Sequence, residues 1–318
     1  MKKELNIVGN RKIFFGISVA ILVIGIVCNI FMGVQLDVSF KGGTLLKYSY
    51  TGTMDESKAI DVIAEKLDHV DPQDIDSTLS MSGDVNILNI SLVEEITLDD
   101  QQAIDQVMSE NFQDNNIKLI NSNSLDPVMG QKFFIKCLVA IALASAFLLI
   151  YVALRFRKIG GWSAAVMALL ALLNDILVAY FTFVIFRIPL NDNFVAVILT
   201  ILGYSLNDTI VIFDRIRENR RLMDSKTPIG VMVNTSINQS LLRSFNTSLC
   251  TFVAVAVMTI LALVTGMDSI ISFTLPMLFG ILSGFYTSTF LCCPMWSAWI
   301  ERKERKAKEK KGSKKARA

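Results

Sequence analysis

The sequence predicts a polytopic α-helical membrane protein with six transmembrane helices and one α+β domain outside the membrane. Three observations support this fold class. Hydrophobic residues make up 52% of the chain and its mean hydropathy is +0.48, which is more apolar than a soluble domain of this length. The apolar residues gather in runs long enough to cross a core of about 30 Å as helices of about 20 residues. Acidic and basic side chains are segregated along the chain.

The six apolar runs are the predicted spans. The first, 13–34, follows a basic segment and is longer than the core of a cleavable signal peptide, which is about 7–15 residues. Since no small-x-small cleavage site follows it, we expect a retained anchor. The last run is long enough to tilt or to extend into the interface. The other five spans are predicted at 133–154, 162–186, 194–213, 245–264 and 269–299.

Lys and Arg residues cluster near alternate ends of the spans. They lie before the first span, between the second and third, between the fourth and fifth, and in the tail 301–318. By the positive-inside rule, residues 1–12 and the tail are cytoplasmic, and residues 35–132 are extracytoplasmic. The tail directly follows a span, so no nucleic-acid binding is predicted. It either lies on anionic membrane lipid or near the ribosome, or is a solvated disordered tail.

The domain at 35–132 is acidic and has alternating strand and helix signals. Its sequence order βαββαβ predicts a ferredoxin-like sandwich. Capping boxes at Thr53 and Thr97 open the two predicted helices, which end near Leu67 and Phe112. We find no catalytic triad, phosphate loop or metal cluster, and the cysteines lie in or beside apolar runs. The sequence therefore predicts no enzymatic activity, no cofactor and no metal. The strands are expected at 44–50, 76–82, 86–93 and 117–125.

Ionisable residues occur inside three predicted spans. The third carries Asn174-Asp175, the fourth carries Asn207-Asp208, and the fifth carries Arg243 near its cytoplasmic end. A charge at the centre of a span costs at least about 2.5–3.5 kcal/mol, so it indicates a functional site.

Polar residues share helical faces with these charges. Thr200 and Tyr204 lie on the face of Asp208, and the two polar faces on consecutive antiparallel helices are expected to meet. The residues recurring around Arg243 are Ser240, Ser244, Thr247 and Thr251.

Two interpretations of this cluster stay open. In the first, a helix movement changes the distance between the Asp208 carboxyl and the Arg243 guanidinium, and Asp208 binds or releases a proton in response. Asp175 is a further member of this ion relay. In the second, the polar residues form a static cluster that only fixes helix packing.

Two further segments have simpler interpretations. Asp214 and Arg215 begin a charged stretch at the cytoplasmic end of the fourth span, where an anchoring role is favoured. The pair Gly42-Gly43 favours a tight backbone turn that joins the first span to the outer domain, rather than a phosphate site.

Residues 203–219, GYSLNDTIVIFDRIREN, closely resemble the fourth-helix signature of the SecF family, subunits of the bacterial protein-export machinery. Residues 37–44, with Asp37 and Phe40 before the glycine pair, are similar to that family's motif after its first helix. The likeness extends to 238–248 and 280–294, so it covers nearly the whole chain. The sequence departs from the family pattern at Asn174, where relatives often have His.

This resemblance implies a partner subunit, SecD, with the same six-span plan. Such pairs of the resistance-nodulation-division superfamily work beside the SecYEG channel in the bacterial cell membrane. They use the proton-motive force, or a sodium gradient, to help draw an exported polypeptide outward. Asp208 and Arg243 match family ion-pathway positions, and Asp175 is a weaker match. Two alternatives remain: ion-coupled efflux of small solutes or lipids, and a non-conducting scaffold for a partner subunit.

Overall fold

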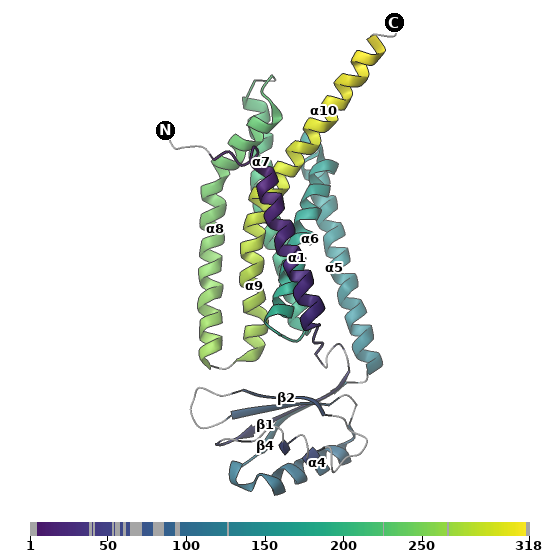
Figure 1. Cartoon of the computed structure of the whole chain (residues 1–318), viewed down its shortest axis with the longest axis vertical. Helices are drawn as coiled ribbons and strands as arrows, with labels where there is room; N and C mark the ends of the chain where they lie inside the picture. The colour runs from purple at the N-terminus through teal and green to yellow at the C-terminus, as the bar shows by residue number, and fades with distance from the viewer. Residues whose placement is uncertain are drawn as a thin grey trace.

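The computed structural model describes residues 5–37, 40, 42–52, 54, 58–59, 62–63, 72–78, 86–92, 96–125, 127–224, 226–265 and 267–315. A bundle of long helices forms one part of the molecule and a sheet domain lies beyond one end of it (Figure 1). Within the described residues, six helices are long and apolar enough to cross a membrane, which agrees with the predicted polytopic class. The helical elements are α1 (Arg11–Met32), α5 (Pro127–Arg155), α6 (Gly161–Ile185), α7 (Asp192–Leu222), α8 (Ile229–Thr265), α9 (Asp268–Tyr286), the π-helical segment η3 (Thr287–Cys292) and α10 (Cys293–Lys315).

The helices α7 and α8 extend well beyond the apolar runs that predicted them. Hydropathy detects only the part of a helix that lies in hydrocarbon, whereas α7 continues through Arg and Glu residues, which are also good helix formers. The polar extensions pack on each other. The Asn219 amide on α7 donates hydrogen bonds to Ser236 Oγ and to Gln239 Oε1 on α8, both at 2.8 Å.

The sixth predicted span contains a π-helical segment between two α-helices. Pro294 has no amide hydrogen and therefore removes the α-helical bond to the Phe290 carbonyl. The preceding turn, η3, is the one that widens to the π form, a distortion that is frequent at functional sites.

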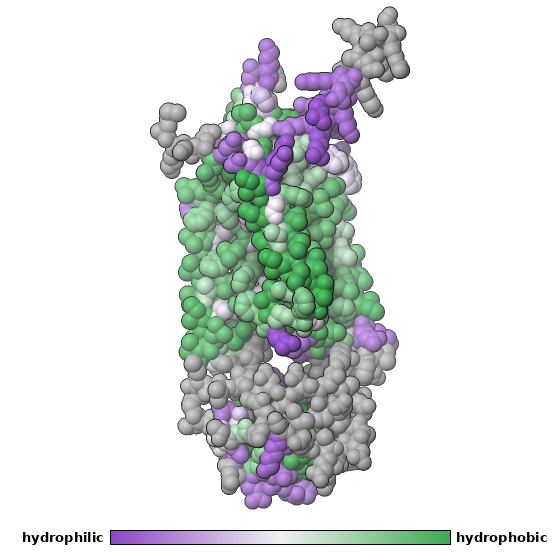
Figure 2. Space-filling model, in the orientation of Figure 1, coloured by the Kyte–Doolittle hydropathy of each residue, from purple (hydrophilic) through white to green (hydrophobic). Residues whose placement is uncertain are grey.

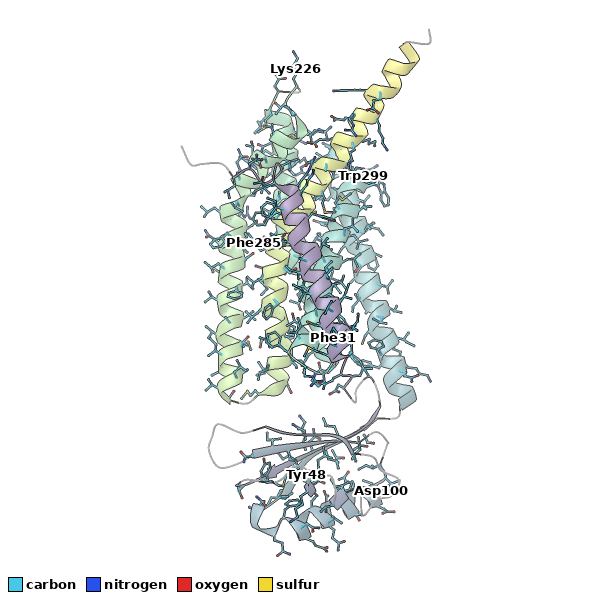
Figure 3. All side chains as sticks on the ribbon, viewed as in Figure 1. Phe31, Tyr48, Asp100, Lys226, Phe285 and Trp299 are labelled. Carbon is cyan, nitrogen blue, oxygen red and sulfur yellow. The ribbon has the colours of Figure 1, made fainter. Side chains whose placement is uncertain are left out.

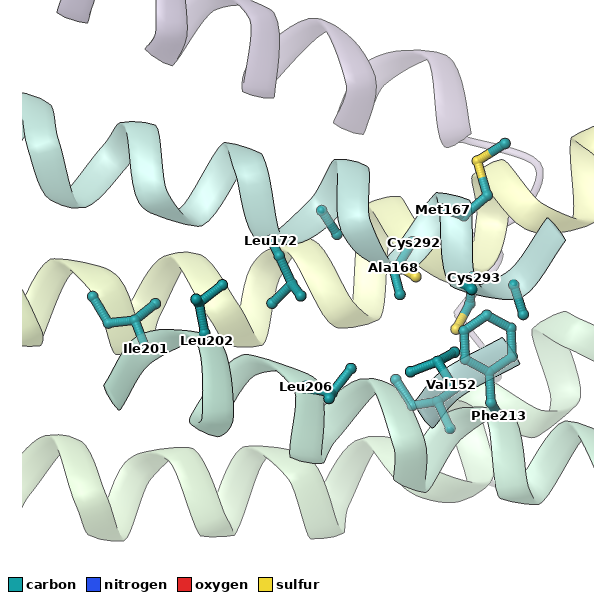
Figure 4. Close-up of a cluster of buried hydrophobic side chains, with 14 of the residues drawn as sticks. Val152, Met167, Ala168, Leu172, Ile201, Leu202, Leu206, Phe213, Cys292 and Cys293 are labelled. Carbon is teal, nitrogen blue, oxygen red and sulfur yellow. The ribbon is translucent and has the colours of Figure 1, made fainter. Parts of the chain in front are cut away.

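The helix bundle has a close-packed apolar core and an apolar outer surface. In the core, the Phe213 ring lies between Phe156 and Trp296, with centroid distances of 5.4 and 5.6 Å. Figure 4 shows Phe213 near Val152 and Cys293 in this core. The outer belt is hydrophobic between two polar ends (Figure 2). Side chains such as Phe31 and Trp299 are 84% and 52% exposed (Figure 3). This outward apolar surface fits contact with lipid, where helix association depends on packing and polar contacts.

The sheet domain contains, within its described residues, a four-stranded antiparallel sheet of order β2-β3-β1-β4. Helix α4 (Leu98–Asn111) joins β3 to β4, and the described residues 58–59 and 62–63 between β1 and β2 are helical. One face of the sheet packs on α4, where Leu46, Ile90 and Ile104 are at most 1% exposed. The strands are β1 (Gly43–Tyr50), β2 (Pro72–Thr78), β3 (Asn86–Leu92) and β4 (Lys118–Leu125).

Two details of the domain test local predictions. The Thr97 capping box is confirmed, because its side chain accepts from the Asp100 amide while Asp100 accepts from the Thr97 amide. The strand predicted at 76–82 begins earlier, at Pro72, because β2 pairs with the whole of β3 as far as Leu92. The last part of that predicted strand, 79–82, and the predicted Thr53 capping box lie outside the described residues.

Candidate functional site

Asp175 on α6 is the most deeply buried carboxylate among the described residues, with 0% exposure. Ser205 Oγ on α7 donates to one carboxylate oxygen and Ser283 Oγ on α9 donates to the other, both at 2.6 Å. The Thr287 hydroxyl lies 2.9 Å from each oxygen. No Lys, Arg or His of the described residues lies within ion-pair distance, so neutral polar groups, chiefly hydroxyls, satisfy this buried acceptor.

Asn174 connects the same site to α1. Ser18 Oγ on α1 donates to Asn174 Oδ1 at 2.6 Å, and the Asn174 amide lies 3.5 Å from Ser283 Oγ. Helices α1, α6, α7 and α9 are therefore joined by one set of buried polar groups. We call Ser18, Asn174, Asp175, Ser205, Ser283 and Thr287 the Asp175 cluster.

Glycine allows α9 to approach α7 closely enough for these bonds. A Cβ atom at Gly284 would lie 3.0 Å from Ser205 Cβ, which is tighter than ordinary packing. A Cβ atom at Gly280, one turn away, would clash with the Ile201 side chain. Small residues at four-residue spacing are typical of close helix contacts in membranes.

Asp208 on α7 occupies a second buried position, with 3% exposure. Ser248 Oγ on α8 donates to its carboxylate at 3.1 Å. The Ser244 hydroxyl, one turn earlier on α8, also interacts with this carboxyl but without hydrogen-bond geometry. The polar residues of α7 and α8 therefore do contact each other, as predicted, and the contact to Asp208 comes from serines of α8.

The pairing of Asp208 with Arg243 is not formed in this conformation. Arg243 is exposed and lines a polar hollow at the end of the bundle, and no carboxylate of the described residues lies within ion-pair distance of it. Arg243 precedes Ser248 by five residues, which places it about 7.5 Å along the helix and about 140° around it. Helix geometry therefore separates the guanidinium from the carboxyl.

The other predicted supporting residues divide between the interior and the surface. Tyr204 is half-buried, and its hydroxyl has no hydrogen-bond partner among the described residues. Asn207 and Thr247 are exposed, and the Thr247 hydroxyl donates to the Arg243 carbonyl of its own helix at 2.9 Å. The polar face predicted on α8 is thus two stripes: Ser240, Ser244 and Ser248 are buried, whereas Arg243 and Thr247 face outward.

Two further hydroxyl groups lie beside the Asp175 cluster. Ser205, which contacts Asp175, accepts at its carbonyl a hydrogen bond from Ser288 Oγ at 2.9 Å. Ser288 Oγ in turn lies 2.9 Å from the hydroxyl of Thr209, the neighbour of Asp208. Buried polar groups therefore continue from the Asp175 cluster to the position beside Asp208.

The glycine pair after α1 has the geometry that a tight turn requires. The φ angles of Gly42 and Gly43 are 82° and 114°, which side chains rarely adopt. Phe40 is buried and packs on the Phe133 and Phe134 rings of α5, with centroid distances of 5.8 and 5.1 Å. The Asp37 amide donates to the Leu190 carbonyl at 3.0 Å, so this motif joins the end of α1 to the loop before α7.

Asp214 and Arg215 lie in the polar extension of α7. Asp214 forms ion pairs with Arg155 on α5 at 3.0 Å and with Arg217 at 2.8 Å. Arg215 pairs with Glu218 and donates to Gln239 on α8 at 2.7 Å. These contacts anchor α7 to its neighbours at one end of the bundle.

Sequence reasoning missed most of the partners of Asp175. Ser283 and Thr287 are four residues apart on the sixth span, and that spacing together with Gly280 and Gly284 was the available signal. Ser18 and Ser205 are single hydroxyls within apolar runs, so no local pattern distinguishes them.

The fold and the site define a class: a multi-span α-helical membrane protein with carboxylates buried among its helices and a small sheet domain beyond them. The model of "Protein export membrane protein SecD/SecF, C-terminal" matches residues 104–302. The chain belongs to the SecD/SecF family.

Relatives of known name agree with this assignment. The chain is 31% identical over 310 residues to the protein translocase subunit SecF of Alicyclobacillus acidocaldarius, covering 96% of both chains. It is 31% identical to the protein translocase subunit SecDF of Bacillus subtilis, covering 96% of this chain but 39% of that one.

Solved structures share the fold. SecDF from Thermus thermophilus, titled a translocon-associated membrane protein, matches with a TM-score of 0.77 at 22% identity. The match covers 94% of this chain and 39% of that chain. The present chain therefore spans about two-fifths of the length of that SecDF chain.

Proposed function

We propose that this chain is an accessory subunit of the Sec protein translocase that couples an ion gradient to the export of polypeptides. Ions pass by way of Asp208 and Asp175, and helix rearrangement moves the sheet domain against the emerging chain. The observation that carries the proposal is the pair of buried carboxylates, which have hydroxyl partners but no cation partner among the described residues. Placing such groups inside a membrane costs free energy, and they are typical of ion pathways.

The buried polar groups beside the two carboxylates support a relay rather than two independent acids. The Thr209 hydroxyl donates to Ser288 Oγ, which donates to the Ser205 carbonyl, so proton transfer between the carboxylates also requires these hydroxyl groups to change partners during the helix rearrangement. The Arg243 guanidinium joins the relay in a second conformation, in which α8 turns toward Asp208. One charge falling through 100 mV releases about 2.3 kcal/mol, enough to bias helix arrangements separated by a few kcal/mol.

The proposed topology places both termini in the cytoplasm and the sheet domain outside. The basic segments support this orientation, since Arg11 pairs with Glu301 at 3.0 Å and Arg155 pairs with Asp214 at the same end of the bundle. The sheet domain lies at the opposite end (Figure 1). The proposed division of the chain is the one expected from the sequence: anchor 13–34, outer domain 35–132 and five further spans between 133 and 300.

We assign the outer domain to the ferredoxin-like class. The strand order β2-β3-β1-β4, with α4 between β3 and β4, is the order that a βαββαβ unit adopts. The proposed partners are SecD, the SecYEG channel and the exported polypeptide. The relatives named SecDF, which are more than twice as long as the matched region, support SecD as the first of these.

The test is export by reconstituted vesicles that contain this chain, SecD and SecYEG. An imposed gradient should accelerate export, and Asp208→Asn or Asp175→Asn should remove the acceleration while assembly persists. Asp192→Asn, which changes an exposed carboxylate at the start of α7, is the matched control. Dissipating the proton and sodium gradients separately identifies the ion.

The same experiment separates the alternatives. Export that continues unchanged in both variants contradicts the relay and leaves the scaffold role. Loss of acceleration with intact assembly contradicts the scaffold role. Ion flux that depends on an added small solute, in vesicles without SecYEG, indicates efflux instead.

A further inference from the structure

A hollow of about 790 Å³ opens between the polar end of α7 and the facing turn of α8. One helical face of α7 and one of α8 line it, because the lining positions recur at three- and four-residue spacing. The lining residues are Val211, Asp214, Arg215, Arg217, Glu218, Arg221, Leu222, Gln239, Ser240 and Arg243.

The hollow has an excess of positive charge. Its described lining contains four arginines against the two carboxylates of Asp214 and Glu218. Those carboxylates already pair with arginines of α5 and α7. Arg221 and Arg243 have no ion-pair partner among the described residues, and they enter the hollow from different helices. Two guanidinium groups free to donate are suited to a phosphate, which arginine binds in a bidentate manner.

The position of the hollow matches the headgroup layer of a membrane. The continuous apolar run of α7 ends at Phe213, and that of α8 begins at Phe245. Each apolar run is about 30 Å long and fills the hydrocarbon core, so the arginines just beyond it reach the headgroup region. Leu222, which lines the hollow, and Leu242, beside Arg243, are 72% and 62% exposed. A ligand bound here therefore contacts both guanidinium groups and apolar side chains.

We infer that this hollow binds the phosphate of an acidic membrane lipid between Arg221 and Arg243, with the glycerol backbone near Leu222 and the acyl chains passing Leu242 toward the hydrocarbon core. Basic pockets between spanning helices are a known way of holding such headgroups. The inference is independent of ion coupling, because it rests only on the charge, the volume and the height of the hollow.

The experiment is native mass spectrometry of the full chain in detergent, with phosphatidylglycerol, phosphatidylcholine or inorganic phosphate added separately. Phosphatidylglycerol should stay bound under conditions that remove phosphatidylcholine. Arg221→Gln should weaken phosphatidylglycerol binding about fivefold, the effect of one basic group at a membrane surface. Arg302→Gln is the matched control, because Arg302 is exposed at the same end but does not line the hollow.

A second variant changes the binding in the opposite direction. Glu218→Gln removes a lining carboxylate and releases Arg215, so it should strengthen phosphatidylglycerol binding about fivefold. Equal retention of both lipids, equal effects of Arg221→Gln and Arg302→Gln, or equally strong binding of inorganic phosphate would overturn the inference. A photo-crosslinker at Leu222 in cells should capture lipid, and capture of a polypeptide subunit alone assigns the hollow to a protein interface and contradicts it.

Discussion

The hydroxyl of Thr287, the first residue of the π-helical segment η3, lies 2.9 Å from both carboxylate oxygens of Asp175 on α6. One side chain therefore connects the most buried charge of the bundle to its least regular helical turn. Because π-helical turns are frequent at functional sites and η3 leads directly into α10, a change at Asp175 has a direct route to the position of α10. This contact is the basis of the first prediction.

Thr287→Val should destabilise the protein by about 1–2 kcal/mol. The substitution keeps the side-chain shape but removes the hydroxyl that both Asp175 oxygens accept, and polar contacts of this size are typical between spanning helices. Thermal unfolding in detergent measures the effect. Thr200→Val is the control, since the exposed Thr200 hydroxyl donates only to its own helix at Ala196. Equal unfolding temperatures for the two variants would show that the contact contributes nothing.

Asp208→Asn and Arg243→Gln should have additive effects on stability. The two groups are not paired in this conformation, and separated sites usually add within about 0.5 kcal/mol. Asp208→Asn and Ser248→Ala, whose groups are hydrogen-bonded at 3.1 Å, should instead be non-additive. Double-mutant cycles from thermal unfolding provide both values. A large coupling energy between Asp208 and Arg243 would mean that the paired conformation dominates at rest.

Gly284→Leu should destabilise the bundle by about 1–3 kcal/mol, because the new side chain overpacks the contact between α9 and α7 at Ser205. It should also weaken the Ser205 hydrogen bond to Asp175 and reduce gradient-driven export. Gly203→Ala is the matched control on α7. No atom lies within 4 Å of its added Cβ, so the change should stabilise the helix by up to about 1 kcal/mol. If Gly284→Leu leaves both the unfolding temperature and gradient-driven export unchanged, the close approach of α9 and α7 is contradicted.

Tyr48 makes the sheet domain sensitive to alkaline pH. Burial, and then the hydrogen bond from its hydroxyl to Asp105, raises the pKa of Tyr48 above its usual value. The protonated Tyr48 hydroxyl therefore contributes fully to the free energy of unfolding below a pH of about 10, where tyrosine ionises in the unfolded chain. This contribution is lost as the pH rises further. Tyr48→Phe should cost about 1 kcal/mol at neutral pH, and the difference from the unsubstituted protein should shrink above pH of about 10.

Circular dichroism melts between pH 7 and about 11 measure this effect. Tyr151→Phe is the control, because Tyr151 is 48% exposed on α5. A difference between Tyr48→Phe and the unsubstituted protein that stays constant across this range would exclude Tyr48 as the titrating group.

The six apolar helices, the separate sheet domain and the family were predictable because the signals are local. A run of apolar residues, an alternating strand and a capping box each extend over a single short stretch of the chain, at most about 30 residues. Thr97 shows this well, since its cap is formed by a residue three positions away. Helix ends were less predictable: α8 begins at Ile229, far before its apolar run, because tertiary contacts with α7 support the polar extension.

By itself, the sequence determined how many helices are long and apolar enough to cross a membrane, that carboxylates lie within them, and which residues of α7 share the face of Asp208. Only the tertiary structure decided which groups satisfy those carboxylates. The partners of Asp175 come from Ser205, Ser283 and Thr287, which are 30 to 112 residues away along the chain. Arg243 was the expected partner of Asp208, yet Ser248 takes that place. The reason is geometric. Arg243 lies five residues before Ser248 and therefore on another side of α8, and only the packing of α8 selects the side that faces inward.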